Sequence, residues 1–161
     1  MNQGCSHIGL ATLDIDATIH FYEQVLGFPR VADHRYEVTE GGSMRMVYFD
    51  IGCDQFVVFM APTAIAGIPK DFDTGINAGL GVPRGIYHLA LRAESDDVLH
   101  RRQQALRAHG VEVSDVVDLG HARSIFFRDP NGVELECCFH LRPFGPADLG
   151  HAQQVSVAFS A

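Results

Sequence analysis

Hydrophobic and polar residues follow the same order in two stretches of the chain. Each stretch opens with a histidine, His7 or His88, and continues with a few alternating residues of the kind that form a strand. Seven residues after each histidine stands a residue suited to cap a helix, Asp14 or Ser95, and an amphipathic segment follows it. The pattern therefore predicts a strand followed by a helix, twice.

The rest of each stretch repeats as well. A shift of 78 residues, without a gap, lays residues 45–60 over residues 123–138. Each of these segments contains two β-rich runs separated by a tight turn, as expected of a hairpin. The sequence thus predicts an α+β fold in which two βαβββ modules form a curved mixed sheet around a cup. The modules cover about residues 5–62 and 86–140 of a single domain, residues 1–161.

Two segments lie outside the repeated pattern. The connection at residues 61–85 is rich in glycine and proline and shows neither the helical nor the strand period. Long loops in compact domains are usually functional, so we expect this one to wall the cup, with Asn77 or Phe72 near a ligand. The C-terminal tail, residues 141–161, ends in an alternating stretch, residues 151–161, that predicts a short strand or an interface segment.

Composition and charge exclude several classes of protein. The chain is 47% apolar and carries a formal net charge of −8, with an isoelectric point near 5.5. Nucleic acids and anionic membrane surfaces attract clustered Lys and Arg, so we expect neither as a partner. No leader-like segment or run of 18 apolar residues is present, and we expect a cytoplasmic protein. Its four cysteines lack C-x-x-C spacing, which predicts reduced thiols.

The segment "DPNGVELECCFH" near the end of the second module carries acidic residues on a predicted strand. Because side chains alternate along a strand, Glu134, Glu136, Cys138 and His140 share one face. A lone histidine on a strand is usually structural, but two repeats related by a pseudo-twofold axis would direct their opening histidines toward one centre. A carboxylate beside them would complete a metal site.

These features resemble the vicinal-oxygen-chelate superfamily, which includes glyoxalases, bleomycin-resistance proteins and extradiol dioxygenases. The resemblance covers about residues 5–140 and is strongest in the paired modules, their opening histidines and "FFRDPNGVELE". In the D-P-x-G-x-x-x-E pattern of that family the metal-binding Glu follows the Gly by four residues, which here is Glu136. The resemblance therefore implies one divalent metal held by His7, His88 and Glu136. Glu134 matches no ligand position, and we interpret it as a rim residue.

One position departs from the four-ligand pattern of glyoxalase I. The overlay places Val58 where the first module would supply a second carboxylate, and Phe56 or Met60 would stand there after a two-residue slip. Two histidines and one carboxylate remain, the facial triad of non-haem Fe(II) oxygenases. The chain is thus most similar to small single-domain extradiol dioxygenase-like members. This implies Fe(II), with Zn, Ni or Mn as alternatives, and a catechol or biphenyl-diol substrate cleaved with O2.

The resemblance leaves other roles open. We interpret His121 either as an acid or base that reaches the substrate, because its pKa range suits proton transfer near neutral pH, or as a solvated loop residue. Cys138 and His140 receive no role. The alternative functions are a glyoxalase-type lyase, a fosfomycin-type thiol transferase and a small-molecule binding protein of the bleomycin-resistance kind. No basic, serine-rich pocket near Glu136 is evident for the transferase, and we keep a homodimer open.

Overall fold

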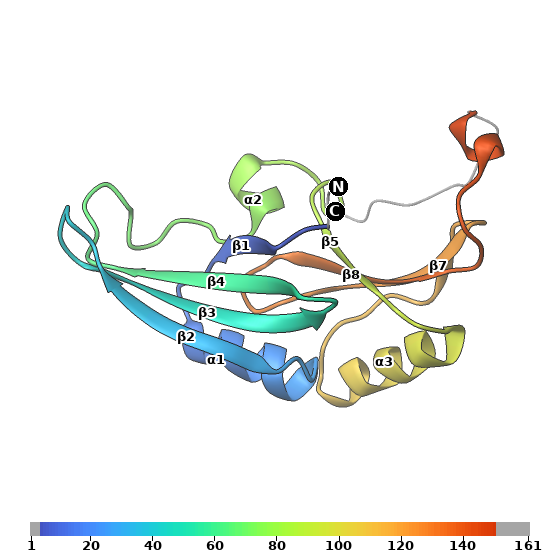
Figure 1. Cartoon of the computed structure of the whole chain (residues 1–161), viewed down its shortest axis with the longest axis horizontal. Coiled ribbons are helices and arrows are strands. Elements are labelled where there is room, and N and C mark those ends of the chain that lie inside the picture. Colours follow the sequence, from blue (N-terminus) through green and yellow to red (C-terminus); the bar gives the residue numbers. More distant parts are fainter. Residues whose placement is uncertain (1–3, 151–161) are drawn as a thin grey trace.

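The computed structural model describes residues 4–150 and contains two βαβββ modules side by side (Figure 1). The alternating stretch predicted at residues 151–161 lies outside the described residues. The first module consists of β1 (His7–Ala11), α1 (Ile15–His20) with the π-helical turn η1 (Phe21–Val25), β2 (Arg30–Glu37), β3 (Ser43–Gly52) and β4 (Gln55–Thr63). The second consists of β5 (Leu89–Arg92), α3 (Asp96–Ala108), β6 (Val117–Asp118), β7 (Ala122–Arg128) and β8 (Glu134–His140). A short helix, α2 (Ile76–Leu80), lies between the modules, and the 3-10 helix η2 (Pro146–Leu149) follows β8.

Each module forms a four-stranded mixed sheet. The strand orders are β1-β4-β3-β2 and β5-β8-β7-β6. In both sheets the first strand pairs in parallel with the last strand of its module, and the other pairs are antiparallel. The predicted α+β class and the duplicated βαβββ unit are confirmed, and within residues 4–150 the hydrogen bonds arrange the strands as two sheets.

The local signals behind this topology act as the sequence predicts. The Asp14 carboxylate accepts a hydrogen bond from the backbone N–H of Ala17 at 2.9 Å, and so caps α1. The Ser95 hydroxyl caps α3 in the same way. Between β3 and β4 the two turn residues, Cys53 and Asp54, have φ angles of 55° and 57°, the left-handed pair that closes a two-residue hairpin.

Both modules contribute to one hydrophobic core. Tyr22, Phe49 and Phe59 from the first module and Leu99 and Phe127 from the second are fully buried members of a single cluster. In Figure 1, α1 and α3 lie on the same side of the molecule, below their sheets. The helix-covered faces therefore pack toward this common core, and the opposite face of each sheet is left outside it.

Buried polar contacts hold the modules together. The hydroxyl of Tyr22 donates to Asp129 at 3.2 Å, and the amide of Asn131 donates to Thr18 at 3.1 Å. Burial raises the pKa of Tyr22, and the neighbouring Asp129 carboxylate raises it further. The turn between β7 and β8 is thus anchored to the first helix.

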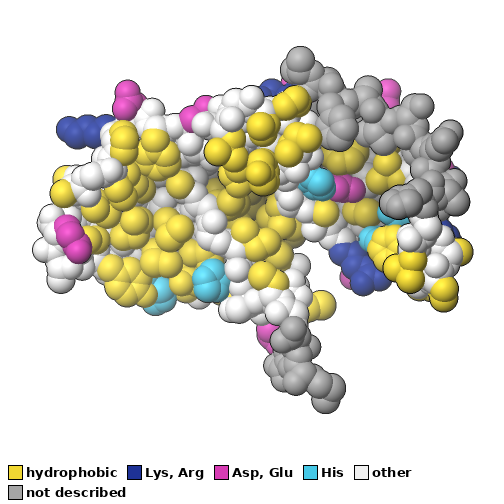
Figure 2. Space-filling model, turned by 90° about the horizontal axis from the view of Figure 1, so that it is seen from above, with side chains coloured by type: hydrophobic (Ala, Val, Ile, Leu, Met, Phe, Trp, Pro, Cys, Tyr) yellow, Lys and Arg dark blue, Asp and Glu magenta, His cyan; other side chains and the backbone are white. Residues whose placement is uncertain are grey.

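The outer face of the first sheet is rich in apolar and aromatic side chains. Strand register places His7, Tyr48 and Met46 on this face, and Tyr36 beside them is 49% exposed. Figure 2 shows hydrophobic side chains gathered over the half of the molecule that contains the first module. The first sheet therefore presents an apolar surface that the rest of residues 4–150 does not fully cover.

Two further expectations can be compared with the structure. All four cysteines are free, as predicted. None of the helices among residues 4–150 combines the length and the apolar composition that a membrane crossing requires.

Candidate functional site

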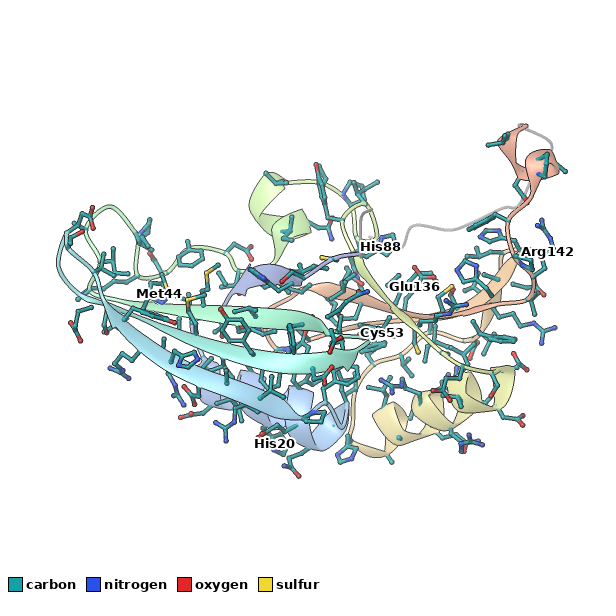
Figure 3. All side chains as sticks on the ribbon, viewed as in Figure 1. His20, Met44, Cys53, His88, Glu136 and Arg142 are labelled. Atoms are coloured by element: carbon teal, nitrogen blue, oxygen red, sulfur yellow. The ribbon has the colours of Figure 1, made fainter. Side chains whose placement is uncertain are left out.

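His88 and Glu136 form the centre of the candidate site. His88 directly precedes β5, and Glu136 lies on the neighbouring strand β8 (Figure 3). The Nε2 atom of His88 is 3.0 Å from Oε2 of Glu136. The Glu136 side chain is 8% exposed, and that of His88 is 36% exposed. The structure thus brings together two of the three metal ligands predicted from the sequence.

Hydrogen bonds fix the orientation of both side chains. Nδ1 of His88 lies 2.9 Å from the carbonyl oxygen of Gly85, and because a carbonyl can only accept, Nδ1 carries the proton. Nε2 of a neutral ring is then a lone pair facing a carboxylate oxygen, an arrangement that needs a cation or an added proton between them. The buried Ser124 hydroxyl donates to the other oxygen of Glu136. The imidazole nitrogen Nε2 of His88 and the carboxylate of Glu136, oriented in this way, suit a divalent metal ion.

The connection between the modules shapes the segment that carries His88. The side chain of Asn77, on α2, donates to the backbone oxygen of Tyr87 at 2.7 Å and accepts from its N–H at 2.9 Å. Asn77 is buried, and through these two hydrogen bonds it fixes the backbone next to His88. Gly85, which orients the imidazole, belongs to the same connection. This segment therefore positions the site.

Glu134, which the sequence pattern places at the rim of the cup, is buried in the structure. It is 5% exposed, and its carboxylate accepts a hydrogen bond from Arg84 at 2.6 Å. Arg128 approaches the same oxygen at 3.6 Å. Basic residues and a serine therefore do surround this part of β8, which the sequence pattern does not predict. Both arginines are engaged by Glu134.

His7 occupies the corresponding position in the first sheet. Its ring centroid is 6.2 Å from that of Tyr48, and its Nδ1 is 3.3 Å from the Ser6 hydroxyl. Among residues 4–150, no group of three His, Cys, Asp or Glu side chains is placed to hold a metal ion. Within one chain, therefore, His7 does not join the His88–Glu136 pair.

Strand register identifies the counterpart of Glu136 in the first module. Glu136 pairs with Ala90, two residues after His88, and Val58 pairs with Gly9, two residues after His7. Val58 therefore stands in the position that Glu136 holds in the second module, as the gapless overlay predicts. Its side chain is fully buried and offers no ligand atom.

A cavity of about 580 Å³ lies along the outer face of the second sheet, starting at Ala90, the strand partner of Glu136. The residues that line it include Ala90, Arg92, Cys138, His140, Arg142 and Phe144. Cys138 and His140, for which the sequence predicts no role, both lie on this wall. Burial raises the pKa of the Cys138 thiol above its ordinary value.

His121 lies at the far end of this cavity. Its ring is 6.0 Å from that of His140 and 5.1 Å from that of Phe144, measured between centroids. It directly precedes β7, whose residue Phe126 pairs with Glu136. Ala122 and Phe126 are four positions apart, roughly 13 Å along a strand. His121 can therefore act only on a substrate that extends along the cavity.

Several residues of the site were not found from the sequence. Ser124 and Phe126 share the outer face with Glu136, and alternation along β7 would have indicated them once that face was chosen. Arg84 approaches from the irregular connection, whose path no periodic pattern encodes. Arg92 follows His88 by four residues on the same face, and alternation along β5 would have indicated it too.

Solved structures with a similar fold belong to proteins with different functions. Lactoylglutathione lyase from Agrobacterium tumefaciens superposes with a TM-score of 0.60 at 18% identity, over 86% of this chain and 95% of that one. TnmS3, an antibiotic binding protein from Streptomyces sp. CB03234, gives 0.59 at 19% identity, over 85% and 95%. FosX, a fosfomycin resistance protein from Listeria monocytogenes, gives 0.57 at 18% identity, over 86% and 94%. At this level of identity the likeness establishes the fold.

Sequence comparison gives the family. A search of curated proteins returned no significant match. A family model, by contrast, matches residues 4–137, a range that holds both modules and ends just after Glu136. Together with the duplicated βαβββ fold, this match shows that the chain belongs to the Glyoxalase/Bleomycin resistance protein/Dioxygenase superfamily.

Proposed function

We propose that this protein is an Fe(II)-dependent dioxygenase that cleaves a catechol or biphenyl-diol type ring beside its diol. The observation that carries the proposal is the pairing of His88 with Glu136 while buried Val58 occupies the equivalent position of the first module. This leaves at most two histidines and one carboxylate as ligands. A facial triad of this kind keeps three coordination positions open, which suits a chelating diol together with dioxygen.

In this proposal, His7 of a second copy of the chain completes the ligand set. The described residues of one chain bring only His88 and Glu136 together, and the packing of both modules into one core turns their outer faces away from it. The face around His7 is apolar and partly exposed, with Tyr36 and Tyr48 on it. A symmetric dimer that joins this face to the second sheet of its partner would bury the apolar surface and bring His7 to the pair.

The surrounding residues would prepare the site for a planar diol. Bound Fe(II) would supply the redox and Lewis-acid chemistry of ring cleavage. Ser124 holds the Glu136 carboxylate in place, and the carbonyl of Gly85 keeps the proton of His88 on Nδ1. Phe126 pairs with Glu136 across the strands and is half-buried, so its ring offers a surface for an aromatic substrate. His121 would exchange protons with the distal end of a long substrate.

A second candidate is a small-molecule binding protein without catalysis. The observation in its favour is the direct 3.0 Å contact between His88 and Glu136, which a protonated imidazole alone could satisfy. Lyase and thiol-transferase chemistry are weaker alternatives, because Val58 removes the fourth ligand of the lyase. The arginines near Glu136 that an anionic substrate of a transferase would need, Arg84 and Arg128, are bound to Glu134.

The test begins with metal-free protein loaded with Fe(II) in the absence of air. A panel of catechols that includes a biphenyl diol is added, and oxygen uptake and the yellow ring-opened product are followed. His88→Ala and Glu136→Gln should abolish both signals. His100→Ala is the matched control, because it removes an exposed histidine from α3 that is remote from the site.

Each alternative has its own signature. Oxygen uptake that requires His88 and Glu136 supports the dioxygenase. Tight binding of a diol without turnover, in metal-loaded and metal-free protein alike, would identify the binding protein. Metal-dependent turnover of a hemithioacetal or a thiol, with silence across the catechol panel, would assign the lyase or transferase instead. Zinc or nickel in protein as purified would not decide the question, because such sites bind these ions more tightly than Fe(II).

A further inference from the structure

Alternate residues of β5 and β8 line the cavity, on the outer face of the second sheet. Ala90 pairs with Glu136, and Arg92 pairs with Cys138, one step further along both strands. Two residues along a strand correspond to roughly 6 to 7 Å. The side chain of Arg92 therefore starts one step beyond Glu136 along the same face, roughly 6 to 7 Å further along the strand direction.

The lining of this cavity is positively charged although the protein is acidic. Among residues 4–150 it contains Arg92 and Arg142 and no Asp or Glu, on a chain whose formal charge is −8. Arg142 is already bound to Asp148 through two contacts of 2.6 and 2.8 Å. Arg92, in contrast, forms no salt bridge with any residue between 4 and 150. Its charge is thus available to a ligand.

A second observation places the charge of Arg92 inside the cavity. Arg92 and Cys138 both line the cavity, and they stand at paired positions on the same face of neighbouring strands. Cys138 is half-buried on the cavity wall and pairs with Arg92. The guanidinium and the thiol therefore face the same space.

The remaining wall suits a flat apolar group. The rings of His140 and Phe144 meet edge to face with centroids 5.3 Å apart, and both line the cavity. The volume of about 580 Å³ lies within the range of small-molecule sites. An aromatic ring with one negative group would match both the shape and the charge of this space.

We propose that the substrate is an aromatic diol that carries a carboxylate, and that Arg92 binds this carboxylate. That the substrate is a diol rests on the proposed function, whereas the binding site for its carboxylate rests on the cavity alone. A guanidinium binds a carboxylate with two parallel charge-assisted hydrogen bonds, and Arg92 is a specificity-determining residue of the site. The ring lies between Phe126, beside Glu136, and the aromatic wall formed by Phe144.

Calorimetry on full-length protein loaded with Zn(II), which binds diols without oxidising them, tests the proposal. Protocatechuate, a catechol with a carboxylate, is compared with catechol. Wild-type protein should prefer protocatechuate by about tenfold or more, the usual weight of a hydrogen bond to a charged group. Arg92→Gln should reduce this ratio to about one. Arg101→Gln, which removes an equal charge from the exposed surface of α3, should leave the ratio unchanged.

Benzoate, added to metal-free protein, separates this inference from the proposed function. Weak binding of benzoate that is lost in Arg92→Gln, even where Fe(II) gives no oxygen uptake, supports the anion subsite and rejects only the dioxygenase. A ratio near one in wild-type protein would overturn the inference. So would a preference for protocatechuate that survives in Arg92→Gln, because the carboxylate would then be bound elsewhere.

Discussion

A single imidazole illustrates how individual residues define this site. His88 is oriented by a backbone carbonyl on one nitrogen and faces a carboxylate with the other. Glu136, in turn, is buried and receives a hydrogen bond from Ser124. Buried carboxylates are costly unless they are paired and hydrogen-bonded, so the cost of burying Glu136 is offset by the same partners that orient it toward His88.

The contact between Ser124 and Glu136 leads to a first prediction. Ser124→Ala should lower the affinity for a divalent metal about 10- to 100-fold, because ligand orientation depends on such partners. It should also destabilise the protein by about 1 to 3 kcal/mol, since a buried acceptor loses its donor. Thr39→Ala, which removes an exposed hydroxyl, is the control. Metal titration and chemical denaturation measure the two effects, and unchanged metal affinity would show that Ser124 has no role in positioning Glu136.

Asp129 leads to a second prediction, on pH dependence. Burial raises the pKa of this carboxyl, and hydrogen bonds from Asn131, Val133 and Tyr22 offset only part of that effect. The folded protein therefore holds the proton more tightly than the unfolded chain. The stabilising contribution is fully present below the ordinary pKa of about 3.9 and is lost as the pH rises through the raised value.

The measurement compares Asp129→Asn with wild-type protein. The free energy of unfolding of wild type minus that of the variant should fall as the pH increases from about 4 toward neutrality. Asp115→Asn, at a side chain that is 99% exposed, is the control for loss of one surface carboxylate. A wild-type advantage that grows with pH would mean that the folded state favours the charged form of Asp129.

The residues of the site differ in how well the sequence predicts them. His88 and Glu136 could be found from the sequence because duplication and strand alternation both single them out. Arg84 could not be found, because its contact with Glu134 spans 50 positions and comes from a segment without periodicity. Joining His7 to the pair was an inference from pseudo-symmetry, and the arrangement of residues within one chain does not by itself produce it.

At the scale of elements, the connection between the modules has a structural task. Its helix α2 is too short to be stable alone, yet Asn77 within it forms two hydrogen bonds with the backbone of Tyr87. The strand β5 begins two residues later, at Leu89, directly after His88. The position of His88 thus depends on an element that belongs to neither module.

This dependence gives a third prediction. Asn77→Ala should destabilise the protein by about 1 to 3 kcal/mol, because it removes a side chain that pairs with a backbone N–H and a carbonyl. It should also weaken metal binding, because His88 loses its support. Leu80→Ala, at a residue of the same helix that is 60% exposed, should change neither quantity appreciably. Chemical denaturation and metal titration measure the two effects. Full metal affinity in Asn77→Ala would show that α2 does not position the site.

The elements themselves were mostly predictable. The caps of α1 and α3 and the hairpin between β3 and β4 are encoded by residues close in sequence, and the structure contains all three. The sequence does not predict the helix α2, because five residues with a glycine among them carry no helical period. Tertiary contacts hold the segment that leads into it, such as the 2.8 Å hydrogen bond that the Thr74 hydroxyl donates to the backbone oxygen of Asn131, and a local pattern does not reveal them.

At the scale of the whole molecule, the two modules meet through their cores. The cluster that joins Tyr22 with Leu99 and Phe127 lies on the helix-covered side of both sheets. His7 and the His88–Glu136 pair lie on the outer faces of the two sheets, away from the helices. Pseudo-symmetry within one chain can therefore create two half-sites, and two copies related by a twofold axis could join them into complete ones.

The final prediction uses this geometry. His7→Ala protein and His88→Ala protein should each bind metal poorly when alone. If the sites form between copies, a mixed dimer has one site with both substitutions and one with neither. Random exchange should then restore about one quarter of the wild-type metal content per chain, because half of the dimers are mixed.

A site contained within a single chain gives the opposite result, because each polypeptide in the mixture still lacks one ligand and no exchange can restore it. The control is a mixture of His88→Ala with Glu136→Gln, which should recover nothing in either case, since both ligands come from the same module. Metal content after co-refolding, together with the mass of the assembly by light scattering, separates the two outcomes. Recovery only in the first mixture, in a particle of twice the chain mass, would place His7 opposite the His88–Glu136 pair of its partner.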